Sequence, residues 1–457
     1  MEVKEILFSL SIALFAGLML SRVAKILKLP AVTAYLVAGI LFGPFCLGKF
    51  GVNGLGFTSL ENVKSFGIIS DVALGFIAFS IGNEFRLSQL KSIGKQATVI
   101  GIIQAVFTTL LVDVALISLH FIIPNQLSLP AAIVLGAVAS ATAPAATLMV
   151  VRQYKAKGPL TDTLLPVVAL DDAVGLVLFS VSFGVAKAFI PGGTVSVTSI
   201  LVEPVIEVLL SVGLGAGMGY AFTFFERFFH SRSKRLSMSV AFVLLTVAIS
   251  KINEETLANL GINIGIHISF SPLLACMMLG TIFCNICDFS AELMDRLDRW
   301  TAPIFILFFV LSGAEFELTI LTDLLIVLVG VVYIVFRCVG KYFGAYCSAK
   351  MVRSPETVKK YLGITLFPQA GVALGMALKA TDAVYGLGEV GVVVANITLF
   401  SVLIYELVGP FLTKISLEKA GEVDPEGKVS ARHEHIKKME EQALLESQSA
   451  NTDNANA

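Results

Sequence analysis

The chain has 457 residues, of which 56% are hydrophobic and 15% are charged, against about 25% charged in an ordinary soluble domain. This composition excludes a soluble globular protein and indicates a polytopic membrane protein. The net charge is −1 and basic residues form only short clusters, which argues against a nucleic-acid partner. We expect neither an enzymatic activity nor a bound cofactor.

Thirteen apolar runs follow one another along the chain, and each is a candidate membrane-spanning helix. They cover residues 6–26, 30–44, 66–85, 98–123, 131–151, 164–185, 200–225, 238–252, 262–286, 302–313, 324–347, 361–378 and 390–412. The first run is long enough to span and no cleavage site follows it, so we expect a retained helix rather than a signal peptide. The sequence thus predicts an all-α transmembrane domain of about 13 helices over residues 1–414. A polar, partly disordered cytosolic tail is expected over residues 415–457.

Basic residues predict the orientation of these helices. Arginines and lysines gather in the loops after the first, third and fifth runs and continue on the same side, whereas the opposite loops hold few. By the positive-inside rule, the N-terminus lies outside and the C-terminus in the cytoplasm, which requires an odd number of spans.

An internal repeat is visible in two short segments. Residues 82–87 read GNEFRL and residues 313–318 read GAEFEL, each at the end of a Phe/Ile-rich run. Seven spans separate them, so the copies run in opposite directions, as in the inverted repeats of transporters, whose sites lie near the midplane. The alternative is a shared helix-end pattern, with Glu84 and Glu315 solvated at the membrane interface.

Two apolar runs contain an interruption at matching places in the two halves. Residues 140–144 read SATAP and residues 367–371 read FPQAG. Proline removes a backbone donor and disfavours helix in the residue before it, so each run is expected to break there. Paired breaks at membrane depth point to a transporter binding site, with Ser140, Thr142, Pro144, Pro368 and Gln369 as candidate residues.

The strongest chemical signal is the adjacent acid pair Asp171 and Asp172 inside a long apolar run. Each intramembrane charge costs roughly 2.5 to 3.5 kcal/mol on insertion scales, so the pair indicates ion or proton handling. From the helical rise, Asp171 lies roughly 5 Å and Lys341 roughly 8 Å to the inner side of their helix centres. Thr142 and Pro368 fall near the centres of their own runs. One slab near the midplane therefore collects the acids, the lysine and both breaks.

Adjacent helical residues point about 100° apart, so the two acids cannot share one partner. We expect Asp171 to pair with Lys341, and Asp172 to face a cavity and hold a proton or Na⁺ in turn. Carbonyls of the broken helix and the Thr142 hydroxyl are candidate cation ligands. Two alternatives remain open: Lys341 is a snorkelling residue, or Arg337, one turn away, takes the pairing role.

These motifs resemble the cation:proton antiporter superfamily, in the branch of bacterial sodium/proton exchangers and Kef-type potassium-efflux transporters. The resemblance rests on residues 22–43 (RVAKILKLPAVTAYLVAGILFG), residues 140–144, the Asp171–Asp172 pair and Gly340-Lys341, and it covers all the apolar runs. It implies a thirteen-helix fold with a dimerisation domain and a core domain of two crossed, broken helices, moving as an elevator, usually in a homodimer. It also assigns Asp172 to the ion and Asp171 to Lys341, as in electrogenic members.

The sequence departs from the Kef-like pattern at two places. Gln369 follows Pro368 where many of those members have an arginine, and no nucleotide-binding domain follows the last run. We therefore expect a Na⁺ (or Li⁺)/H⁺ antiporter of a prokaryotic cell (inner) membrane, with a role in pH homeostasis. A K⁺/H⁺ antiporter is the alternative within the class. From other classes, a cation channel or a transport-inactive cation-sensing receptor is the alternative.

Overall fold

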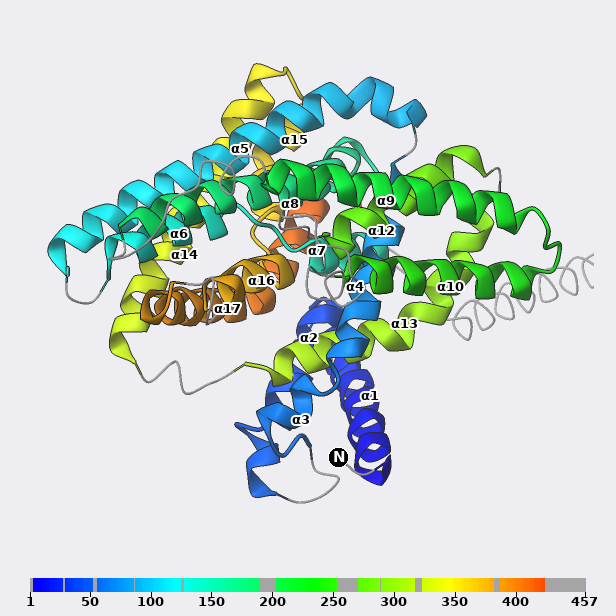
Figure 1. Ribbon diagram of the computed structural model, residues 1–457, viewed down its shortest axis with the longest axis horizontal. Helices are drawn as coiled ribbons and strands as arrows, with labels where there is room; N and C mark the ends of the chain where they lie inside the picture. Colours follow the sequence, from blue (N-terminus) through cyan, green and yellow to red (C-terminus); the bar gives the residue numbers. More distant parts are fainter. Residues whose placement is uncertain are drawn as a thin grey trace, which may run out of the picture.

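A computed structural model describes residues 3–27, 29–51, 56–85, 87–124, 127–189, 203–252, 270–287, 289–316, 323–381 and 387–423 (Figure 1). Within these ranges the regular structure is entirely helical, which confirms the predicted all-α class. The first half contains α1 (Val3–Ile26), α2 (Ala31–Phe42), η1 (Leu47–Phe50), α3 (Leu60–Lys64), α4 (Gly67–Glu84), α5 (Leu87–Ile122), α6 (Leu129–Val138), α7 (Pro144–Gln153), α8 (Pro159–Ala188) and α9 (Glu203–Glu226). The second half contains α10 (Arg232–Ser250), α12 (Pro272–Ile286), α13 (Ser290–Ala314), α14 (Leu324–Met351), α15 (Glu356–Thr365), α16 (Gly371–Ala380) and α17 (Glu389–Lys419).

Nine of the described helices are long and apolar enough to cross a membrane, and three shorter helices are also apolar. The chain is thus a multi-pass membrane protein, although this finding does not fix the predicted number of thirteen spans. Part of the predicted run at residues 262–286 lies outside the described residues. Two helices begin well before their apolar runs, α5 by eleven residues and α13 by twelve. A helix satisfies its own backbone hydrogen bonds, so it continues into charged sequence that a hydropathy pattern leaves out.

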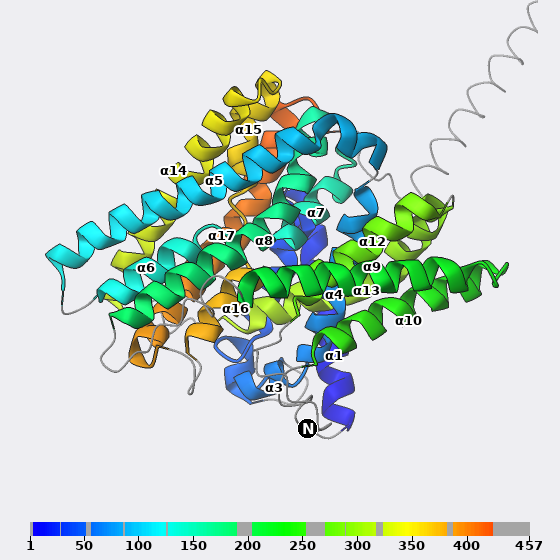
Figure 2. The same ribbon diagram turned by 45° about the horizontal axis from the view of Figure 1, so that its top comes forward.

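The helices pack as two bundles (Figures 1 and 2). The first bundle contains α1, α2, α4, α10, α12 and α13, with α9 packed on α12. The second bundle contains α5 to α8 and α14 to α17. Contacts of α2 and α4 with α7, and of α2 with α17, join the two bundles.

The glycines of the two repeated segments have the same structural role. A Cβ atom at Gly82 of α4 would strike the backbone carbonyl of Met277 on α12, and a Cβ at Gly313 of α13 would strike that of Leu36 on α2. Each glycine therefore lets its helix approach a neighbour backbone to backbone. This equivalence supports an internal repeat rather than a chance similarity of helix ends.

Both predicted interruptions are breaks in the helices. Residues 139–143 separate α6 from α7, and residues 366–370 separate α15 from α16. Pro144 is the first residue of α7, where no backbone donor is needed, so the proline defines where the second half-helix begins. The two breaks meet, because the Ala143 amide donates to the Pro368 carbonyl at 2.8 Å.

The last helix extends past the predicted end of the transmembrane domain at residue 414. α17 continues to Lys419, and the chain then turns so that Glu422 meets the beginning of α8. The Glu422 carboxylate accepts hydrogen bonds from the amides of Leu160 (2.6 Å) and Thr161 (2.8 Å). An acid at a helix N-terminus is favourable, so this contact holds the end of α17 to the helix that carries the two aspartates. Residues 424–457 of the expected tail lie outside the described residues.

Candidate functional site

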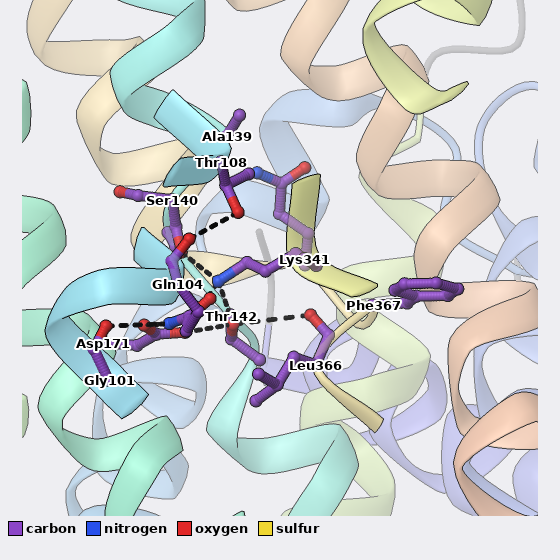
Figure 3. A network of polar contacts seen from close by, with 12 residues as sticks. Gly101, Gln104, Thr108, Ala139, Ser140, Thr142, Asp171, Lys341, Leu366 and Phe367 are labelled. Atoms are coloured by element: carbon purple, nitrogen blue, oxygen red, sulfur yellow. Dashed lines mark hydrogen bonds and ion pairs between the residues drawn. The ribbon is translucent and has the colours of Figure 1, made fainter. Parts of the chain in front are cut away.

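Asp171 of α8 and Lys341 of α14 form an ion pair in the interior of the second bundle. Lys341 Nζ lies 2.8 Å from Asp171 Oδ2, and both side chains are 0% exposed (Figure 3). The Thr142 hydroxyl, in the break between α6 and α7, donates to the same carboxylate oxygen at 2.5 Å. A buried ion pair is tolerated only when its remaining hydrogen-bonding capacity is satisfied, and these contacts meet that requirement.

The lysine is bound to the broken helix as well as to the aspartate. Lys341 Nζ donates to the Ser140 carbonyl at 2.5 Å and to the Thr142 hydroxyl at 2.9 Å. The Ser140 carbonyl lies just past the carboxyl end of α6, where the helix dipole is negative, so a cation is favoured there. Lys341 is fully buried and bonded on all sides, so it is not a snorkelling residue.

Gln104 of α5, which is not among the residues predicted from the sequence, contacts the other oxygen of Asp171. Its Nε2 atom donates to Asp171 Oδ1 and to the Gly101 carbonyl (Figure 3). The available signal was an amide inside an apolar run, which is costly unless it is hydrogen-bonded.

Close packing of α5 against α14 brings Gln104 and Lys341 to opposite sides of Asp171. A Cβ at Gly340 would lie 2.9 Å from the Cα of Thr108, and one at Gly344 would lie 3.0 Å from the Cα of Gln104. These two glycines, four residues apart on one face of α14, allow the backbones to approach.

Asp172 differs sharply from its neighbour in the sequence. It is 9% exposed, and its Oδ1 atom is buried without a hydrogen-bond partner in the described part of the chain. The turn of the helix directs it away from the partners of Asp171, as the 100° spacing predicts. With both acids ionised and Lys341 protonated, the three groups carry one net negative charge, which matches one proton or one monovalent cation.

Arg337 does not take the pairing role that was an alternative for it. The Arg337 side chain is 0% exposed, and its guanidinium donates to three backbone carbonyls. The guanidinium carbon Cζ lies 4.4 Å from the centroid of the Tyr405 ring. The accepting carbonyls are those of Ala139 (2.9 Å), Ala141 (2.6 Å) and Phe367 (2.7 Å). Arg337 therefore satisfies the ends of both broken helices at once, because its planar group offers several donors in a fixed geometry.

Gln369 and Pro368 belong to the second break and lie apart from the acid pair. Gln369 Nε2 donates to the Val138 carbonyl and to the Tyr333 hydroxyl, each at 2.9 Å. Ser401 adds a weaker contact to the amide oxygen at 3.4 Å. The neutral amide thus ties the second break to α6, α14 and α17. The hydroxyl of Ser140 similarly serves its own helix, since it donates to the Ala137 carbonyl.

A cavity of about 1350 Å³ opens between the two bundles on the side where α8 begins. Its walls include Tyr35 of α2, Asn83 of α4, Phe305 of α13, and Leu165 and Pro166 of α8. Pro166 precedes Asp172 by six residues, or roughly 9 Å of helical rise. The lining of the cavity on α8 therefore stops short of the acid pair.

The chain matches a known protein family over most of its length. The family model described as "Sodium/hydrogen exchanger, transmembrane" matches residues 10–419. No curated protein matches the chain. Two solved structures of the sodium proton antiporter MjNhaP1 from Methanocaldococcus jannaschii are similar in fold.

The first, at pH 8, has a TM-score of 0.66 and 18% sequence identity, over 91% of this chain and 97% of that chain. The second, from electron microscopy, has a TM-score of 0.72 and 17% identity, over 93% of this chain and 100% of that chain. The family is one of transporters rather than enzymes, and its model spans nearly all the described helices. The chain therefore belongs to the sodium/hydrogen exchanger family and is a cation/proton antiporter.

Proposed function

We propose that the protein exchanges Na⁺ (or Li⁺) for protons at Asp172, across a prokaryotic cell membrane, and so serves pH homeostasis. The observation that carries the proposal is the contrast between the two adjacent acids. Asp171 is neutralised by Lys341 and hydrogen-bonded on both oxygens, whereas Asp172 Oδ1 has no partner in the described part of the chain. A lone intramembrane carboxyl beside a fully neutralised one is suited to bind a single positive charge.

Exchange follows from competition for this one carboxyl. Burial and the neighbouring negative charge disfavour an empty, ionised Asp172, so it holds either a proton or a cation. Protein carbonyls at the broken helix, and the Thr142 hydroxyl where it is released from Asp171, are the oxygen ligands that a hard cation prefers. Lys341 keeps Asp171 occupied, so the cation meets one carboxylate and not two.

The two bundles provide the moving parts of an elevator mechanism. The second bundle carries both breaks and the acid pair, so it is the core domain, and the first bundle is the dimerisation domain of a homodimer. The positive-inside rule predicts that α8 begins at the cytoplasmic face, and with that orientation the cavity beside it supports an inward-open conformation. Arg152 of α7 and Asp298 of α13, 2.5 Å apart, join the two bundles at that face.

The test is Asp172→Asn in proteoliposomes with an imposed pH gradient, with Na⁺, Li⁺ or K⁺ added and the membrane potential clamped or free. The wild type should collapse the gradient on addition of Na⁺ or Li⁺, and the variant should not, while remaining folded. Asp71→Asn is the matched control, because Asp71 is a partly exposed acid paired with Lys251 at 2.8 Å, far from the breaks. Exchange at the wild-type rate in Asp172→Asn would contradict the proposal, and a response to K⁺ alone would identify the other cation.

A further inference from the structure

Glu406 of α17 is another acid inside an apolar helix, and the exchange mechanism above gives it no role. It is 2% exposed, and its Oε2 atom is buried with no hydrogen-bond partner among the described residues. It stands inside the apolar run at residues 390–412, where an acid is costly. A buried polar atom left without a partner is uncommon in a folded protein and needs an explanation.

The position of Glu406 is at the boundary between the two bundles and close to the second break. The Thr33 hydroxyl of α2 donates to the carbonyl of Leu407, the next residue, at 3.5 Å. One turn along α17, Gly409 packs on Pro368, since a Cβ there would lie 3.0 Å from the Pro368 Cα. Glu406 therefore lies on the second bundle, within one helical turn of a residue that packs on the break, and beside the first bundle.

The charged groups around Glu406 offer it no positive partner. Glu315, at the end of α13 in the first bundle, is the ionisable group that acts on it electrostatically, and Lys64 lies near Glu315. From α14, Arg337 is directed to the Tyr405 ring, and Tyr333 is bound to Gln369. Other ionisable groups on this part of α17 and on the helices packed against it include Tyr405, Cys338 of α14, whose Sγ lies 3.6 Å from the Tyr405 hydroxyl, and Tyr35 of α2.

A carboxylate with no cationic partner among the described residues and with one oxygen buried without a donor is, in a membrane interior, far less stable than the neutral acid. We propose that Glu406 is a second proton-binding site, separate from Asp172, which is protonated in this conformation and releases its proton when the bundles shift. The inference rests on the proposed function for the movement of the second bundle. Its ligand is a proton, and Glu315 is the opposing group on the other bundle.

This site would make the movement itself sensitive to pH. Ionised Glu406 and Glu315 are like charges facing each other across the boundary, so loss of the Glu406 proton disfavours the present arrangement of the bundles. Exchange should therefore depend on two ionisations, one at the exchanging site and one at Glu406.

Infrared difference spectroscopy on the purified full chain, titrated with alkali, tests the site without any need for transport. The wild type should show a carbonyl band of a protonated carboxylic acid that is missing in Glu406→Gln and retained in Asp172→Asn. Thr413→Val is the matched control, because Thr413 is also buried on α17 with an unpartnered side-chain oxygen. In Glu315→Gln the band should disappear at lower pH, since removal of the like charge makes ionised Glu406 easier to form.

Transport measurements then test the coupling. Glu406→Gln should still exchange, with an unchanged KM for Na⁺ but a less steep pH dependence, whereas Thr413→Val should behave as the wild type. The proposal is overturned if Glu406→Gln removes no carbonyl band, or if Glu315→Gln leaves the titration of the band unmoved. If Glu406→Gln does not fold, the Glu315→Gln titration decides alone. If the wild type shows the band but does not exchange cations, the proposed function fails while the proton site stands.

Discussion

The two broken helices use the same backbone device for different purposes. Each consists of two ten-residue half-helices around a five-residue break. The first break is buried throughout, and the second is buried except for the partly exposed Phe367. The first break contacts charge: Thr142 binds both Asp171 and Lys341, and the Ser140 carbonyl accepts from Lys341. The second break contacts neutral groups, through Gln369 to Val138 and Tyr333.

The first break thus contacts the charged groups of the candidate site, whereas the second break contacts groups that hold the helices together. In the proposed mechanism the charged side chains at the first break change partners during transport, whereas the Gln369 amide at the second break holds the crossing in one geometry. Arg337 belongs to both, since it donates to carbonyls of each break. The comparison predicts that substitutions at the first break change transport and that those at the second break change mainly stability.

Lys341→Met should have the largest effect on stability. It leaves Asp171 as an uncompensated buried charge, so we expect a loss of about 3–5 kcal/mol and little transport. Thermal unfolding in detergent measures the loss. The double variant Lys341→Met with Asp171→Asn should recover part of it, because the orphaned charge is then gone. A Lys341→Met variant as stable as the wild type would contradict the importance of the pair.

Arg337→Met should come next, because it removes donors from three buried carbonyls at once. Each unsatisfied group costs about 1–3 kcal/mol, and relaxation of the breaks should limit the total to about 3 kcal/mol. Transport should fall as well, since both breaks lose their common anchor. Arg337→Lys tests the geometry, because a single ammonium group cannot reach three carbonyls and should recover little.

Thr142→Val and Gln369→Leu sharpen the comparison, since each removes side-chain hydrogen bonding from one break. Thr142→Val loses a bond to a charged group, which is worth about 1.5–3 kcal/mol, and should impair exchange strongly. Gln369→Leu should cost about 1–2 kcal/mol with exchange largely retained in the folded fraction. Equal loss of exchange per folded protein in the two variants would refute the distinction between the breaks.

Much of the fold could be predicted from hydropathy and proline placement. The breaks at residues 139–143 and 366–370 were predicted from Pro144 and Pro368, because proline acts on its own backbone and that of the residue before it. Proline alone does not decide a break, since Pro166, Pro303 and Pro410 lie inside continuous helices. The ends of the helices were harder to predict, because α5 and α17 extend into charged residues that local hydropathy leaves out. The number of spans stays a prediction, since the region before α12 lies outside the described residues.

The candidate site, like the fold, could be predicted from the sequence only in part. Asp171, Asp172 and Lys341 were singled out because a charge in an apolar run is conspicuous, and the structure places Asp171 beside Lys341. Gln104 was missed, because one amide in an apolar run gives a weak signal. The alternative pairing role for Arg337 was wrong, since a difference of one helical turn decides which partner a side chain reaches, and no local pattern records it.

The sequence by itself determined where the costly groups are: which helices carry acids, which helices break, and which adjacent residues face apart. These are properties of single segments, set by helical geometry and by the cost of burying charge. Only the tertiary structure decided which groups meet, because that depends on close packing of distant helices. Gly340 and Gly344 let α14 approach α5, and thereby place Lys341 and Gln104 on either side of Asp171 while Asp172 Oδ1 is left without a partner among the described residues.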